Sequence, residues 1–451
     1  MRRSFFIPFL ASTALVATPA MAQDSEVETL RAQVRALQSQ LDALNARLDT
    51  VEEQQTTVLA IEQSPATGVA AAPAAPAEEP VAIGFGAAPE FESAAGFTFK
   101  PFGRIQADAG TINLPDGLAA TDGFSSELRR ARIGFEGEIP GGFGYKLEVD
   151  FATGAAELTD VFLTYGDGPL TLTAGQHNNF QGLEELTSSR WSSFIERAAF
   201  TDAFGFERRL GVSAQYSAGN VLVQAGAFSD NIEDLPGKNS SYDGRIVFAP
   251  KLGDNQLHLG GSLHYADLES GQSVRYRQRP LVHFTSDRLI NTGNIGAESE
   301  FGYGAEAAFI AGPFHAAGEV FWQQVNRPDA SLADPTFFGG YAEIGYFITG
   351  EKRGYKSFKF DRTRPTRTID EGGLGAFQVN LRYDYLDLND AGIIGGVQNG
   401  YFASLVWVPT DYTRMMLNYG RLAYDDAVLA VPSGDTSYNA DVLAVRAQID
   451  F

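Results

Sequence analysis

From residue 97 to the last residue, apolar and polar side chains alternate with a period of two. The final stretch shows this plainly, because Val445, Ala447, Ile449 and Phe451 are apolar and the residues between them are polar. Successive side chains of a β-strand point to opposite faces, so the alternation predicts strands with one apolar and one polar face. Similar runs begin near residues 97, 130, 145, 157, 169, 206, 220, 241, 256, 299, 314, 337, 374, 397, 412 and 439.

These runs number about sixteen, and most are roughly ten residues long, which is the strand length that a transmembrane β-barrel requires. After the N-terminus the chain has no long apolar run, and an open sheet cannot satisfy its backbone groups in lipid. We therefore expect an all-β fold, a sixteen-stranded antiparallel transmembrane β-barrel over residues 97–451. A terminal strand that ends on Phe451 also resembles the insertion signal of outer-membrane barrels.

An even number of strands sorts the connections into two sets. Short, glycine-rich turns are expected at 140–142, 166–168, 217–219, 312–313 and 409–411, on the side that faces the periplasm. Long polar loops are expected outside, at 110–125, 177–205, 229–240, 267–298, 326–336 and 423–438. Residues 349–373 break this rule, because they form a long connection on the side of the short turns. Either this turn is elaborated or a strand nearby has been miscounted.

The N-terminal residues have a different pattern. Arg2 and Arg3 precede a short apolar core, and Ala20-Met21-Ala22 fits a cleavage site, so residues 1–22 are predicted to be a cleaved signal peptide. Residues 23–61 carry apolar residues at alternating spacings of three and four, which predicts a coiled coil in the periplasm. Residues 62–96 are rich in Ala and Pro and are predicted to be a linker.

Composition excludes some classes of function. The chain has no cysteine, so it contains neither disulfides nor thiolate metal sites. The net charge of −22 argues against nucleic acid as a partner. None of the five histidines forms a metal-ligand pair on a helix, and His258 and His264 are interpreted as lumen lining. No nucleotide-binding or hydrolase motif stands in its proper setting, so we expect no enzyme, no metal and no cofactor. An outer-membrane hydrolase is the alternative.

Basic residues lie where a solute inside a barrel would meet them. Arginine presents a planar fork of donors that suits phosphate oxygens, and a row of arginines can pass an anion along. The alternative is that inward arginines pair with inward carboxylates and stabilise a wet wall. Candidates on inward strand positions are Lys100, Arg104, Arg130, Arg132 and Lys146, with Arg209, Arg245, Arg382, Arg414 and Arg446 further along. Candidates in loops are Arg190, Arg197, Arg275, Arg277 and Arg279.

Nine short motifs, in this order and spacing, resemble the phosphate-selective porin family of the porin O and P type. They are residues 127–134, 175–176, 183–184, 188–191, 196–197, 208–212, 275–280, 291–293 and 349–351. The resemblance covers residues 97–451 and implies a homotrimeric sixteen-stranded channel in the outer membrane of a Gram-negative cell. It implies that the loop 177–205 folds into the pore with Arg190 near the constriction, and that Arg275, Arg277 and Arg279 form the outer part of an arginine ladder.

The chain departs from the family pattern at His177-Asn178-Asn179, where many relatives carry an aromatic residue and often a lysine. It therefore lacks one cation that those relatives place near the constriction. The favoured prediction is a passive channel biased towards anions such as phosphate or polyphosphate, with membrane lipid and small anionic solutes as partners. The alternatives are a general or differently selective channel, and a structural barrel tethered through its coiled coil.

Overall fold

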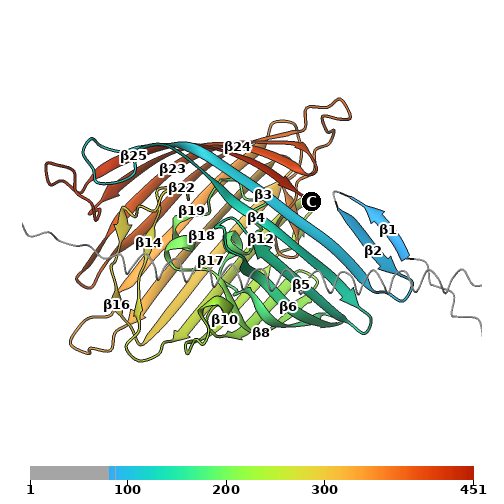
Figure 1. Cartoon of the computed structure of the whole chain (residues 1–451), viewed down its shortest axis with the longest axis horizontal. Coiled ribbons are helices and arrows are strands. Elements are labelled where there is room, and N and C mark those ends of the chain that lie inside the picture. Colours follow the sequence, from blue (N-terminus) through green and yellow to red (C-terminus); the bar gives the residue numbers. More distant parts are fainter. Residues whose placement is uncertain (1–80, 87) are drawn as a thin grey trace, which may run out of the picture. The chain divides into compact units, whose positions relative to one another are not determined.

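The computed structural model describes residues 81–86 and 88–451. The predicted signal peptide, the coiled coil and the first part of the linker lie outside the described residues. The main sheet joins nineteen strands, of which sixteen form the wall of a barrel and β1, β2 and β11 are short additions (Figure 1). The predicted all-β barrel of sixteen antiparallel strands is confirmed.

The wall strands follow one another in chain order, each paired with the next. Their bounds are β3 Thr98–Asn113, β4 Gly123–Ile139, β5 Phe143–Asp150, β6 Glu157–Asp167, β7 Leu170–Asn178, β8 Arg208–Ala218, β9 Val221–Phe228, β10 Ser240–Phe248, β12 Asn255–Asp267, β17 Ser299–Ala311, β18 Phe314–Asn326, β19 Thr336–Phe347, β22 Ala376–Asp390, β23 Ile393–Thr410, β24 Thr413–Asp425 and β25 Tyr438–Asp450.

The last strand closes the sheet against the first. β25 pairs with β3 from Asn113 opposite Asp441 to Arg104 opposite Asp450. Beyond that pairing, Gly103 and Phe451 exchange backbone hydrogen bonds of 2.9 and 3.0 Å. A closed sheet leaves no unpaired wall edge, which is the condition for crossing lipid with strands.

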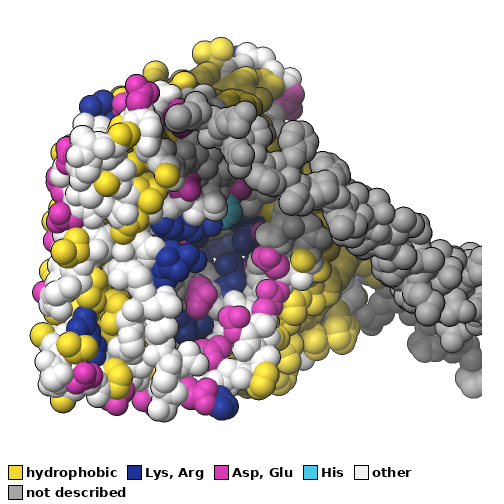
Figure 2. Space-filling model, turned by 60° about the vertical axis from the view of Figure 1, so that its left-hand side comes forward, with side chains coloured by type: hydrophobic (Ala, Val, Ile, Leu, Met, Phe, Trp, Pro, Cys, Tyr) yellow, Lys and Arg dark blue, Asp and Glu magenta, His cyan; other side chains and the backbone are white. Residues whose placement is uncertain are grey.

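The alternation along each strand divides the wall into an apolar outside and a polar inside. On β25, Leu443, Val445 and Ile449 are exposed on the outer face, whereas Arg446 and Gln448 are buried inside. Figure 2 shows the hollow of the barrel lined with basic and acidic side chains. The period-two pattern in the sequence therefore identified both faces.

The two ends of the barrel differ in their connections. At one end, here the turn end, the connections include residues 140–142, 168–169, 219–220, 249–254 (with β11, Lys251–Leu252), 312–313 and 411–412. At the other, the loop end, the chain passes through residues 114–122, 151–156, 179–207, 229–239, 268–298, 327–335 and 426–437, and the short turn 391–392.

Residues 348–375 are the exception at the turn end. They contain a small hairpin, β20 (Gly354–Lys356) paired with β21 (Lys359–Asp361), which is separate from the wall. The long connection is therefore an elaborated turn, and the count of sixteen wall strands stands.

Part of the predicted linker, residues 62–96, is structured. β1 (Val81–Phe85) and β2 (Pro89–Ser93) form a hairpin, and β2 pairs with the start of β3 at Phe91–Phe99 and Glu92–Thr98 (Figure 1). These residues of the predicted linker therefore form strands, in which Phe91 of β2 stands opposite Phe99 of β3.

The remaining elements lie in the loops. Residues 179–207 contain α2 (Leu183–Leu186) and α3 (Ala199–Ala203), and η1 is Ile232–Asp234. In the loop 268–298, β13 (Ser273–Val274) pairs with β16 (Ile295–Gly296), and β14 (Arg277–Gln278) pairs with β15 (Ile290–Asn291). Among the described residues, no helix has the length and apolar character needed to cross a membrane.

Candidate functional site

Residues 179–207, the constriction loop, fold into the barrel and are held there by wall side chains. Glu319 of β18 accepts hydrogen bonds from the backbone N–H groups of Leu183 and Glu184, at 2.8 and 2.6 Å. On the other side of the loop, Arg414 of β24 donates to the carbonyl oxygens of Arg190 and Ser192, at 2.8 and 2.6 Å. Further bonds run from Ala199 N–H to Asp384, from Ile195 N–H to Asn418 and from the Ser404 hydroxyl to the carbonyl of Ser193.

Aromatic side chains also pack between the constriction loop and the barrel wall. Phe200 and Phe206 lie against Phe321 of β18, with ring centroids 6.3 and 4.8 Å apart, and Phe194 packs on Phe402 of β23. All of these anchors belong to β18, β22, β23 and β24. The wall residues that line the remaining passage beside the loop belong to β3 to β8.

Burial changes the ionisation of the loop carboxyl groups. Burial raises the pKa of Glu184 to about 7, against a weaker opposing effect of Arg382. Burial also raises the pKa of Glu185, although Arg197 lies 3.2 Å away. Burial opposes the ionisation of Glu196 too, but Arg129 and Arg130 outweigh it and hold the pKa of that carboxyl well below its usual range.

The hairpin β20–β21 enters the barrel from the turn end and meets the constriction loop. Arg353 donates to the carbonyl oxygen of Trp191 at 2.6 Å, and the guanidinium of Arg362 lies 4.3 Å from the Trp191 ring centroid. The Tyr355 hydroxyl lies 2.6 Å from His258 Nδ1 on the wall strand β12. Two segments from opposite ends of the barrel thus meet at Trp191.

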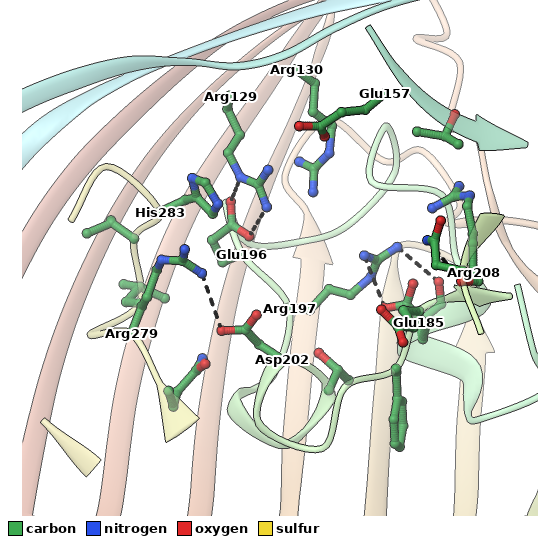
Figure 3. Close-up of a pocket in the computed structure, with 18 of the residues that line it drawn as sticks. Arg129, Arg130, Glu157, Glu185, Glu196, Arg197, Asp202, Arg208, Arg279 and His283 are labelled. Atoms are coloured by element: carbon green, nitrogen blue, oxygen red, sulfur yellow. Dashed lines mark hydrogen bonds and ion pairs between the residues drawn. The ribbon is translucent and has the colours of Figure 1, made fainter. Parts of the chain in front are cut away.

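Three connected cavities remain between these segments and the wall. The outer chamber, near the loop end, has a volume of about 270 Å³ and shares Arg130, Glu185, Arg197 and Arg208 with the constriction (Figure 3). The constriction has a volume of about 230 Å³ and shares Lys146 and Lys356 with the inner chamber. The inner chamber, at the turn end, measures about 870 Å³. Shared lining residues make the three cavities one pathway.

Positive charge is concentrated at the constriction. Nine cations and three carboxylates line it: Arg104, Arg130, Arg132, Lys146, Arg190, Arg197, Arg208, Lys356 and Lys359, with Asp160, Glu185 and Asp361. The outer chamber is lined by five arginines and six carboxylates, and the inner chamber by three lysines and three glutamates. Among the three cavities, cations therefore outnumber carboxylates only at the constriction.

About half of the constriction cations form ion pairs with carboxylates of the wall. Arg104 and Arg132 pair with Glu148 at 3.0 and 2.8 Å, and Lys146 and Arg208 pair with Asp160 at 2.8 and 2.5 Å. Among the described residues, four cations of the constriction have no ion-pair partner within 4.0 Å. These four are Arg130, Arg190, Lys356 and Lys359.

Of the fifteen basic residues that the sequence suggested, the structure brings six together at the constriction: Arg104, Arg130, Arg132, Lys146, Arg190 and Arg197. Lys100 lies next to them in the inner chamber, 3.7 Å from Glu90. Arg197 also donates to the carbonyl oxygens of Glu184, Glu185 and Thr187, so it holds the constriction loop in shape while it lines the pathway.

The three arginines of the loop 268–298 are less uniform than predicted. Arg279 lines the outer chamber, 3.8 Å from Asp202, but Arg275 and Arg277 line neither chamber nor constriction. Burial, and then the neighbouring Arg279, lower the pKa of Arg288 to about 10, with smaller effects of Arg277 and Arg275. Arg288 thus belongs to the same cluster, and sequence reasoning missed it.

Sequence reasoning also missed Lys356, Lys359 and Arg208. The signal for the two lysines was the unexpectedly long connection 349–373, in which Lys356 and Lys359 flank the tip of the hairpin. Arg208 stands opposite Asn178 in the pairing of β7 with β8. Asn178 belongs to the stretch that departs from the family pattern, so its strand neighbour supplies a cation at that place in the constriction.

A closed barrel of sixteen strands with a polar lumen, an inward-folded loop and a continuous pathway defines a porin, a channel of the outer membrane and not an enzyme. The sequence comparison gives the family. Residues 99–451 match the model of the family described as phosphate-selective porin O and P, and the chain belongs to it.

Individual relatives agree with this assignment. The chain is 46% identical to an uncharacterised protein of Caulobacter vibrioides, over 98% of this chain and 94% of the relative. It is 28% identical to porin O of Pseudomonas aeruginosa, over 66% of this chain and 74% of that protein. Among solved structures, OmpT of Vibrio cholerae has a similar fold, with a TM-score of 0.52 at 10% identity, over 80% of this chain and 99% of the OmpT chain.

Proposed function

We propose that this porin is a passive diffusion channel biased towards anions such as phosphate or polyphosphate. The observation that carries the proposal is a group of four constriction cations that have no ion-pair partner in the described part of the chain: Arg130, Arg190, Lys356 and Lys359. A charge without a counter-ion in a narrow, low-dielectric passage attracts solute ions of opposite sign and repels those of like sign. The net charge of −22 over the whole chain matters less, because exposed charges are screened beyond about 8–10 Å at physiological salt.

The donors at the constriction suit phosphate in particular. The Arg190 guanidinium reaches Ser188 at 3.3 Å and lies 5.0 Å from the ring centroid of Trp191, with no carboxylate within 4.0 Å among the described residues. A guanidinium binds two oxygens of one phosphate at once, whereas chloride offers a single acceptor. Arg190 and the lysines of the hairpin lie on different segments around the same cavity. A phosphate could therefore be passed from one segment to the other without a single tight site.

The setting of the channel is part of the proposal. The loop end would face outside and the turn end the periplasm, with the coiled coil of residues 23–61 in the periplasm after removal of residues 1–22. The apolar outer face of the wall would contact membrane lipid, and the channel would assemble as a homotrimer. The resemblance of the sequence to porin O and P, together with the heptad pattern of residues 23–61, supports these statements.

The test is single-channel recording with the full-length protein in a planar bilayer. In a potassium chloride gradient, the reversal potential should show preference for chloride, and added phosphate should block the chloride current. Arg190→Ala should weaken the block by about tenfold, as expected for the loss of one charge-assisted contact of about 1.5 kcal/mol. Arg421→Ala is the matched control, because Arg421 lies half exposed on β24 and pairs with Asp441. Preference for potassium, or a block indifferent to Arg190, would overturn the proposal.

A general or differently selective channel is the second candidate. It is favoured by the balance of charges in the outer and inner chambers and by the ion pairs of Arg104 and Arg132 with the wall. A reversal potential near zero, with no block by phosphate, would support it. A third possibility, a structural barrel tethered through its coiled coil, requires a barrel that does not conduct at all.

A further inference from the structure

The outer chamber is lined by acidic residues whose presence the proposed anion channel does not explain. Its six carboxylates are Glu157, Glu185, Glu196, Asp202, Glu207 and Glu233. Four of them stand beside arginines: Glu185 with Arg197, Glu196 with Arg129, Glu207 with Arg209 and Asp202 with Arg279, at distances of 2.7 to 3.8 Å. These pairs leave little net charge in the chamber.

Glu157 and Glu233 differ from the other four. Among the described residues, neither has a cation within 4.0 Å. Glu157 accepts a hydrogen bond from the hydroxyl of Thr153 at 2.7 Å, and Glu233 accepts one from the backbone N–H of Leu158, also at 2.7 Å. Both carboxylates line the outer chamber. Free negative charge at the mouth of a pore repels an anion such as inorganic phosphate and lowers its rate of entry.

The same cavity holds an unpaired cation. Arg130 donates to Gln106 at 2.9 Å and has no carboxylate within 4.0 Å among the described residues. Arg130 lines both the outer chamber and the constriction, whereas Glu157 and Glu233 line the outer chamber alone. Figure 3 shows Arg130 and Glu157 in the outer chamber. The free charges of the chamber are thus sorted along the pathway, with the carboxylates on the chamber side and the guanidinium at the entrance to the constriction.

We infer that the outer chamber receives phosphate monoesters that also carry an ammonium group, with the phosphate at Arg130 and the ammonium attracted by the free carboxylates of Glu157 and Glu233. This inference rests on the proposed function and narrows its substrate class. Such a solute turns the repulsion at the mouth into an attraction, while its phosphate still meets the cations of the constriction. It would enter with the phosphate leading and the ammonium group behind.

The test compares two solutes that differ mainly in the ammonium group, O-phosphoethanolamine and ethyl phosphate, as blockers of chloride current through the full-length channel. At pH 8 both phosphate groups are largely doubly ionised, so ethyl phosphate carries the larger net negative charge. Attraction by the constriction alone would therefore favour ethyl phosphate. We expect the opposite. Phosphoethanolamine added at the loop end should block at a concentration about threefold lower than ethyl phosphate, because contacts of an ammonium group with partly exposed carboxylates are weak.

The Glu157→Gln/Glu233→Gln double variant keeps both acceptor positions and removes only the charges. In this variant the two solutes should block at equal concentrations, or ethyl phosphate should block at the lower concentration. Glu298→Gln is the matched control, because Glu298 is exposed in the loop 268–298 and lines none of the three cavities. The control should keep the ratio of the two blocking concentrations that the parent channel shows.

The outcomes separate this inference from the proposed function. If the parent channel prefers ethyl phosphate, or if the double variant keeps the preference for phosphoethanolamine, the inference is overturned while block by ethyl phosphate leaves the anion channel intact. If neither solute blocks and the channel does not prefer chloride, the proposed function falls and the inference falls with it.

Discussion

At the scale of single residues, the ion partner of a cation decides what it does in this pore. Arg104 is buried, pairs with Glu148 and donates to the Ser189 hydroxyl, so its charge is used inside the wall. Lys359 lines the same cavity without an ion-pair partner among the described residues, so its charge is available to a solute. The sequence predicts only which side chains point into the barrel. It does not distinguish a cation that is paired within the wall from one that is available to a solute.

Lys359→Gln should therefore change selectivity without changing stability. We expect the permeability ratio of chloride to potassium to fall by about twofold, because one of four free charges at the constriction is lost. Lys251→Gln, in a turn at the same end and outside the three cavities, is the control. An unchanged ratio would show that the lysine does not face the permeating ions.

Arg104→Gln should have the opposite profile. It leaves Glu148, which is 1% exposed, with only Arg132 as a cationic partner. Loss of one partner of a buried charge should cost roughly 2–4 kcal/mol of unfolding free energy, to be measured by denaturant titration of the detergent-solubilised barrel. A stability equal to that of the parent would mean that solvent replaces Arg104.

Glu184 gives the constriction loop a pH dependence. Its pKa is raised to about 7 in the folded protein, from an ordinary value of 4.5, so the folded state holds the proton more tightly than the unfolded state. The stabilisation is fully present below about pH 4.5 and is lost as the pH rises to about 7. Between pH 5 and 8 the melting temperature should fall more steeply for the parent than for Glu184→Gln. Equal slopes would contradict the assignment.

At the scale of elements, the constriction is made by two segments that are not part of the wall. Wall residues of β18, β22, β23 and β24 bind several backbone groups of the constriction loop, and loop side chains such as Arg190 and Arg197 line the pathway. The most direct tie of the loop near Arg190 is Arg414, which holds the carbonyl groups on both sides of Trp191.

Arg414→Ala should loosen that part of the loop. Two charge-assisted hydrogen bonds disappear, each worth roughly 1.5–3 kcal/mol. We expect noisier single-channel current and a weaker phosphate block. Arg421→Ala, seven residues further along β24 and outside the cavities, should leave both unchanged. A quiet current in Arg414→Ala would show that the remaining ties from Asn418 and Ser404 are sufficient.

The hairpin β20–β21 can be removed as a unit. Replacement of residues 354–361 by a short Gly-Ser turn takes Lys356, Lys359 and the contact with His258 out of the lumen. Conductance should rise, and the preference for chloride should fall, because the cavity widens and loses two free cations. An unchanged conductance would place the narrowest point elsewhere.

At the scale of the whole molecule, the seam that closes the barrel includes one close contact, between Gly103 and the ring of Phe451. A Cβ atom on Gly103 would lie 2.4 Å from Cζ of Phe451 and 2.9 Å from the carbonyl oxygen of Arg132. Gly103→Val should therefore weaken the β3–β25 seam and lower the temperature at which the folded band is lost on mild gels. Gly244→Ala, whose Cβ would have one neighbour at 3.7 Å, should not. An equal effect of both would point to a general intolerance of strand glycines.

The sequence predicted the wall well because each strand carries its own evidence. Val445, Ala447 and Ile449 alternate with polar residues whatever the rest of the chain does. The interior of the pore is different, because its contacts join residues far apart in the chain, such as Arg414 with the carbonyl of Arg190 and Arg353 with that of Trp191. No local pattern encodes these bonds. The sequence placed Arg275 and Arg277 on the pathway because it does not show their contacts with Asn291. Arg277 pairs with Asn291 across a short hairpin, and Arg275 donates to the Asn291 side chain.

The meeting of the constriction loop and the hairpin at Trp191 has a consequence for how such channels diversify. Folding and membrane insertion depend on the strands. The width and charge of the constriction depend on two connections between strands, the constriction loop and the segment that contains β20 and β21. Each connection can lengthen, shorten or change sequence without disturbing a strand register. Evolution or protein engineering can therefore change the selectivity of the pore through either segment while the β-barrel stays the same.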